Sequence, residues 1–95
     1  MSRSIPAPEI LDTGVGSGRW VVVIFDNDVT PLDEVIEILM ISTGCGVQEA
    51  SIETWEAQHY GHASVHFGDM DECEIVAHMI SSIGVRTQVV REWTE

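Results

Sequence analysis

The residues with the clearest chemical potential form a short polar turn, Asp26-Asn27-Asp28, directly after the apolar segment Trp20–Phe25. Two carboxylates and an amide in three consecutive positions can accept hydrogen bonds from a cationic group. Their negative charge repels phosphate, and no glycine-rich loop follows the apolar segment, so a nucleotide site is not expected here. The turn therefore argues against a phosphate-bearing ligand.

Three histidines, His59, His62 and His66, lie close together in the sequence and raise the question of a metal site. In an extended strand His62 and His66 would share one face and lie about 13 Å apart, at ~3.3 Å per residue. Zinc requires each ligating nitrogen at about 2 Å, so the two side chains cannot easily share one ion. We expect both to be surface residues, with no metal ion or other cofactor bound. His59 falls in the last turn of an expected helix, where the helix dipole alone can explain a histidine.

The sequence does not indicate catalysis. Serine, cysteine and histidine are present, but their spacing does not suggest a nucleophile paired with a base. Carboxylates such as Asp33 and Glu37 stand at the spacing of an ordinary solvated helix face. The two cysteines, Cys45 and Cys73, are too few for a disulfide framework or a thiolate metal cage, and we expect both to be reduced. We therefore expect a binding protein and not an enzyme.

Six expected elements, in the order β-α-α-β-α-β, position these residues. The segment Trp20–Phe25 is β-branched and aromatic, which is typical of a buried strand. Thr30 as N-cap, with Pro31 at the first helical position, predicts a helix that ends before Gly44. The core-facing residues of this helix recur at helical spacing: Leu32, Val35, Ile36, Leu39 and Met40.

The second half of the chain predicts a helix over 47–60, a strand over 62–67, a helix from 69 to 84 and a strand over 85–93. The helix over 47–60 has a weak apolar face, carried by Val47, Ala50 or Ser51, and Trp55. In the strand that follows, alternation predicts two faces: Ala63, Val65 and Phe67 inward, and His62, Ser64 and His66 outward. Asp69 begins a capping box that opens the third helix. The predicted fold class is α+β, a small antiparallel three-stranded sheet with three helices.

Composition limits the partners. Sixteen acidic residues against four basic ones give a formal net charge of −12, which argues against nucleic acid and membrane surfaces as partners. Residues 1–18 hold proline, glycine and small polar residues, so we expect a flexible N-terminal tail there and one folded domain over 19–95. The apolar runs are too short to cross a bilayer and the N-terminus lacks the pattern of a secretory signal, so the expected location is cytoplasmic.

Two segments resemble the ClpS family, adaptors that hand proteins with a degradation-promoting N-terminus (an N-degron) to the Clp unfoldase–protease. Phe25-Asp26-Asn27-Asp28-Val29-Thr30-Pro31-Leu32 is similar to the family signature, in which a strand ends in Asn-Asp-Asp and runs through Thr-Pro into the first helix. Ala57-Gln58-His59-Tyr60 resembles the Ala-Val-His element that closes the family's second helix. The resemblance covers residues 19–93, and the family has the same order of elements.

The resemblance implies a pocket for an N-terminal Leu, Phe, Trp or Tyr, and the N-terminal domain of a Clp-type AAA+ unfoldase as the second partner. The charged α-amino group would be held by Asp26, Asn27 and His59, because three acceptors satisfy the three donors of an ammonium. The residues implied for the side-chain pocket are Thr30, Leu32, Val35, Trp55 and Gln58.

The sequence departs from the family pattern in several places. The first two residues of the Asn-Asp-Asp motif are swapped to Asp26-Asn27, and Gln58 replaces an apolar pocket residue. Matching both motifs needs one extra residue between Cys45 and Trp55. The third helix opens acidic, with Asp69, Asp71, Glu72 and Glu74, and lacks the basic residue that many family members use against the unfoldase. Two alternatives therefore stay open: an interaction module of this fold that has lost degron binding, and a small metal-binding domain built around the three histidines.

Overall fold

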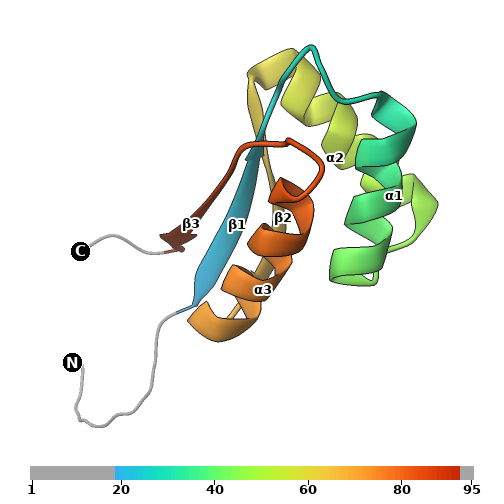
Figure 1. Ribbon diagram of the computed structural model, residues 1–95. Helices are drawn as coiled ribbons and strands as arrows, with labels where there is room; N and C mark the ends of the chain where they lie inside the picture. The colour runs from blue at the N-terminus through green and yellow to red at the C-terminus, as the bar shows by residue number, and fades with distance from the viewer. Residues whose placement is uncertain (1–18, 93–95) are drawn as a thin grey trace, which may run out of the picture.

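The order of the helices and strands agrees with the sequence prediction. The structure, a computed structural model, describes residues 19–92, so the expected tail at 1–18 and residues 93–95 lie outside the described residues. The elements are β1 (Trp20–Phe25), α1 (Leu32–Thr43), α2 (Val47–Tyr60), β2 (His62–Gly68), α3 (Met70–Ser81) and β3 (Thr87–Arg91) (Figure 1). The predicted α+β class and the order β-α-α-β-α-β are confirmed.

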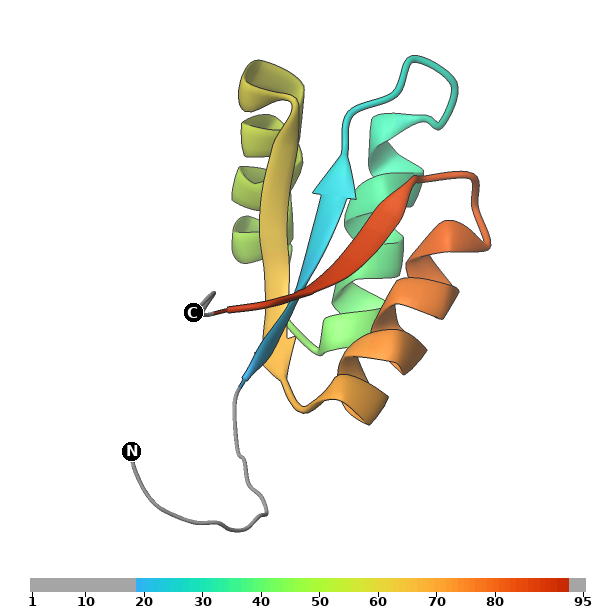
Figure 2. The same cartoon turned by 90° about the vertical axis from the view of Figure 1, so that its left-hand side faces the viewer.

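The three strands form one antiparallel sheet with β1 in the centre, in the order β2-β1-β3. All three helices lie on the same face of this sheet, as Figure 2 shows. Val22 and Ile24 of β1 pack there against Leu39 of α1 and Ile80 of α3, and all four are among the most deeply buried side chains. This core fixes the end of β1, from which the acidic turn departs.

A β-bulge interrupts β2 and changes which side chains face the helices. Val22 pairs with His66 while the next residue of β1, Val23, pairs with Ser64, so Val65 is an extra residue in the ladder. Beyond the bulge the alternation is reversed: His66 lies on the helix side, and Phe67 lies on the open face with 43% of its surface exposed. The expectations that His62 and His66 share a face, and that Phe67 points inward, were therefore wrong.

The buried face of α2 also differs from the expected one. Its buried residues are Ala50, Glu53, Thr54 and Ala57, whereas Val47 and Trp55 are about half exposed. This face follows the 3.6-residue period, but small and polar residues occupy it, so apolar side chains alone do not reveal it. The alanines let α2 lie close against β2 and α1.

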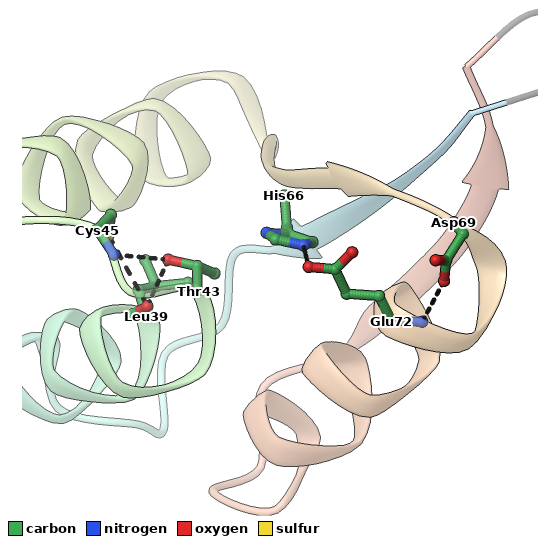
Figure 3. A network of polar contacts seen from close by, with 6 residues as sticks. All are labelled: Leu39, Thr43, Cys45, His66, Asp69 and Glu72. Atoms are coloured by element: carbon green, nitrogen blue, oxygen red, sulfur yellow. Dashed lines mark hydrogen bonds and ion pairs between the residues drawn. The ribbon is translucent and has the colours of Figure 1, made fainter.

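Of the two helix starts predicted from capping residues, that of α3 is confirmed and that of α1 was wrong. Asp69 caps α3, because its carboxylate accepts a hydrogen bond from the backbone N–H of Glu72 at 2.8 Å. Figure 3 shows that the Glu72 side chain reaches back to β2, where its carboxylate lies 3.0 Å from Nε2 of His66. Thr30 does not cap α1; Pro31 occupies the cap position, and the Thr30 hydroxyl donates instead to the carbonyl of Ile83 at 3.1 Å.

Candidate functional site

The acidic turn between β1 and α1 is held by the side chain of Asn27. The Asn27 carbonyl oxygen Oδ1 accepts hydrogen bonds from the backbone N–H groups of Val29 and Thr30, each at 2.8 Å. The amide Nδ2 donates to the carbonyl of Gly84 at 3.3 Å and to the hydroxyl of Thr30 at 3.4 Å. Asn27 thus ties the turn to the loop between α3 and β3, and both acceptor positions of its oxygen are already occupied.

Further bonds anchor the turn to the other side of the fold. The backbone N–H of Asp26 donates to the carbonyl of Gly61, the residue that ends α2, at 3.0 Å. On the opposite side Thr30 is bonded to Ile83. The turn is therefore fixed between the C-terminal ends of α2 and α3, and the side chain of Asp26 remains exposed.

Behind the turn lies a narrow, mainly apolar slot between α1, α2 and the sheet. The buried residues that line the slot form its floor: Ile24, Val35, Thr54, Ala57 and Val85. The cavity volume is about 20 Å³, which is room for one water molecule and not for a bulky side chain. A large apolar group can enter only if the slot widens.

A wider and shallower cleft adjoins the slot on its open side. It has a volume of about 360 Å³ and is lined by the whole turn from Asp26 to Leu32 together with Gln58 of α2. Five residues line both the slot and the cleft and so form the rim between them: Asp26, Asn27, Thr30, Leu32 and Gln58. We refer to these five as the rim.

His59 and Trp55 interact with each other beside this site. Nδ1 of His59 lies 3.0 Å from the carbonyl oxygen of Trp55, and the two rings are stacked with centroids 4.0 Å apart. A carbonyl can only accept, so Nδ1 carries the proton and the exposed Nε2 is the acceptor nitrogen of neutral His59. Neither residue lines the slot or the cleft.

The structure thus gathers six of the eight residues that the sequence analysis singled out: Asp26, Asn27, Thr30, Leu32, Val35 and Gln58. It leaves His59 and Trp55 outside the cavities. It also adds Asp28, which lines the cleft, and Thr54, Ala57 and Val85, which line the slot. Asp28 belongs to the same acidic turn and could have been included from the sequence; Val85 could not, because only the tertiary fold brings it there.

Within residues 19–92 two ionisable groups have clearly raised pKa values, and neither lines the slot or the cleft. Burial, together with the nearby carboxylates of Glu49 and Glu56, raises the pKa of Glu53 from 4.5 to about 7. Burial is also the main cause that raises the pKa of the Cys73 thiol above 9.0, which keeps this buried cysteine protonated and unreactive.

Within residues 19–92 no group of three or more His, Cys, Asp or Glu side chains is placed to hold a metal ion. The bulge is one reason that the histidines do not form such a group, since it turns His62 and His66 to opposite faces of the sheet. In the same part of the chain, the helices are too short and too polar for any of them to span a membrane.

Comparison with known proteins agrees with this architecture. The family model described as ATP-dependent Clp protease adaptor protein ClpS matches residues 16–88. No curated protein matches the sequence. Among solved structures, ClpS2 of Agrobacterium tumefaciens bound to L-phenylalaninamide is similar, with a TM-score of 0.75 and 18% sequence identity over 79% of this chain and 98% of that chain. At this identity the likeness shows a shared fold, and the family match spans most of the sequence. The chain therefore belongs to the ClpS family of Clp protease adaptor proteins.

Proposed function

We propose that this chain binds the free N-terminus of proteins whose first residue is bulky and hydrophobic, and delivers them to a Clp-type AAA+ unfoldase. The observation that carries the proposal is the position of the acidic turn at the mouth of an apolar slot. Membership of an adaptor family supports this role. The similar ClpS2 chain was solved with L-phenylalaninamide, a ligand that joins a free α-amino group to a bulky apolar side chain.

The chemistry of the site fits such a ligand. An α-amino group has a pKa near ~8 and is charged at neutral pH, so the exposed carboxylate of Asp26 attracts it to the rim. Asn27 keeps the turn in place, and His59 offers Nε2 as an acceptor beside the cleft. Once the slot widens, the first side chain would enter it past Thr30 and Leu32 toward Val35. Gln58 would lie on the α2 side, and Trp55 would stay outside the slot. Binding of this kind makes and breaks no covalent bond, as expected for an adaptor and not an enzyme.

A pair of matched peptides tests the proposal. A fluorescently labelled peptide that begins with Leu, and the same peptide with an acetylated N-terminus, are titrated and their anisotropy is measured. Acetylation removes the positive charge and at least one charge-assisted hydrogen bond of ~1.5–3 kcal/mol, so we expect about tenfold to hundredfold weaker binding. Equal binding of the two peptides would refute degron recognition.

Delivery is tested separately from binding. We expect the N-terminal domain of a Clp-type unfoldase to form a complex with this chain whether or not the peptide is present, because an adaptor needs two surfaces. Failure of that complex, with peptide binding intact, would refute delivery and leave recognition standing.

Two observations favour a second candidate, an interaction module of the same fold that no longer binds degrons. The slot holds only about 20 Å³, and His59 is engaged by Trp55 outside the cavities. Such a module would bind the unfoldase domain and neither peptide, which separates it from the first proposal.

A further inference from the structure

Gln58 occupies a distinctive position at the candidate site. It is the α2 residue of the rim, since it lines the slot together with Thr54 and Ala57 but also lines the cleft. Thr54 and Ala57 are buried on the floor, whereas Gln58 is exposed. A ligand whose first side chain points to the floor must leave its own main chain at the rim, because the rest of the peptide has to exit through the cleft. Gln58 therefore faces the α-amino end of such a ligand and not the tip of its side chain.

The acceptors expected to hold the α-amino group are only partly free. Asn27 uses both acceptor positions of Oδ1 on backbone N–H groups at 2.8 Å, and these bonds hold the turn itself. To accept from an ammonium, Asn27 would have to give up one of them. His59 lies outside both cavities, and its ring is fixed by the Trp55 carbonyl and by stacking on the indole. The carboxylate of Asp26 alone cannot satisfy three donors without further acceptors nearby.

The amide of Gln58 meets this need. Within residues 19–92 no hydrogen bond engages the Gln58 side chain, and its amide oxygen has two acceptor positions available. It stands on α2, whereas Asp26 stands on the turn, and both line the slot and the cleft. Two acceptors from different elements of one rim can hold an ammonium, one by charge and one by its carbonyl dipole.

We propose that Gln58 is an acceptor for the α-amino group of the bound N-terminus, acting with Asp26 in place of the amide oxygen of Asn27. This assignment rests on the proposed function, because it presupposes a ligand with a free α-amino group. It gives the polar residue at position 58 a role. Compared with the family pattern, which has an apolar residue here, the slot has one apolar wall residue fewer and the rim has one more hydrogen-bond acceptor. Discrimination between free and blocked N-termini then depends on position 58.

Substitutions at position 58 and a matched control on the same helix test this. Gln58→Leu keeps a similar size and removes the acceptor, and Gln58→Glu replaces it with a carboxylate. Gln48→Leu is the control, because Gln48 is exposed on α2 and lines neither the slot nor the cleft. Each variant and the wild type are titrated with the labelled Leu peptide in its free and acetylated forms at neutral pH, and thermal unfolding confirms that each variant is folded.

We expect Gln58→Leu to weaken binding of the free peptide about tenfold or more while binding of the acetylated peptide changes little, so that the ratio of the two affinities collapses. Gln58→Glu should bind the free peptide more tightly than the wild type, and Gln48→Leu should match the wild type. An unchanged or tighter affinity of Gln58→Leu for the free peptide would overturn the assignment. So would an equal loss for both peptides, which indicates a structural role. In either case recognition by the wild type would remain, whereas a wild type that ignores acetylation refutes the proposed function and this assignment with it.

Discussion

Glu53 provides a sharp test of the energetics of this fold. Its side chain lies on the buried face of α2 with only 8% of the residue exposed, and its Oε1 has no hydrogen-bond partner among the described residues. Burial is the main reason that its pKa rises from 4.5 to about 7, and the carboxylates of Glu49 and Glu56 on the same helix add to the rise. Each of these effects disfavours the charged form in the folded state.

The size and sign of the effect follow from linkage. One pKa unit corresponds to about 1.36 kcal/mol, so a rise from 4.5 to about 7 makes ionised Glu53 cost about 3 kcal/mol of folding free energy. Because the pKa is higher in the folded state, the folded protein binds the proton more strongly than the unfolded chain does. The stabilisation that comes from this tighter proton binding is fully present below pH 4.5 and is lost as the pH rises through about 7.

Replacing Glu53 with Gln removes the titration and keeps the shape of the side chain. The free energy of unfolding of Glu53→Gln and of the wild type is measured by urea denaturation between pH 4 and pH 8. We expect the free energy of unfolding of the variant, relative to that of the wild type, to rise by about 3 kcal/mol from pH 4 to pH 8, since glutamine has no proton to lose. Other carboxylates titrate in both proteins, so the difference between the two curves isolates Glu53.

A control separates this effect from a general loss of charge. Glu37→Gln alters an exposed residue of α1, and its stability relative to the wild type should change little with pH. If the difference between Glu53→Gln and the wild type is constant from pH 4 to pH 8, Glu53 is not held in an unfavourable environment. That result would refute the reasoning from its burial.

Two further predictions concern the N-terminal cap of α3 and the stacked pair Trp55 and His59. Asp69→Ala removes the side-chain cap of α3 and should lower the free energy of unfolding by about 1 kcal/mol, measured by urea denaturation; no loss would mean that the bond to the Glu72 N–H contributes nothing. Trp55→Met should change the free energy of unfolding by under about 1 kcal/mol, because the indole is 48% exposed and stacks on His59; a loss of ~3 kcal/mol would make it a core residue.

The order of elements could be predicted because its signals are local. The β-branched run of Trp20–Phe25 is too short for a helix, and the residue patterns of the helices are closed by glycines. Gly44 and Gly61 adopt left-handed conformations, with φ of 79° and 89°, directly after α1 and α2. Such signals depend on neighbouring residues only, and so the sequence contains them in full.

The features that could not be predicted depend on contacts between distant segments. The bulge at Val65 arises from the pairing of β2 with β1, and a single strand's alternation does not reveal it. On α2, Glu53 and Thr54 are buried because the helix packs between β2 and α1, whereas Trp55, which was expected on the inner face, is half exposed. A large aromatic residue was therefore a poor guide to the inner face of this helix.

The swapped order Asp26-Asn27 has a physical explanation in the structure. Position 27 must accept from two backbone N–H groups and also donate to the carbonyl of Gly84. An amide can do both, whereas a carboxylate can only accept and would face the Gly84 carbonyl as an unfavourable neighbour. Asparagine at 27 thus holds the turn, and the carboxylate at position 26 is left free at the rim, where a charged ligand can reach it. The departure from the family motif at these two positions therefore places the amide where both donor and acceptor bonds are needed, and leaves the carboxylate at the rim.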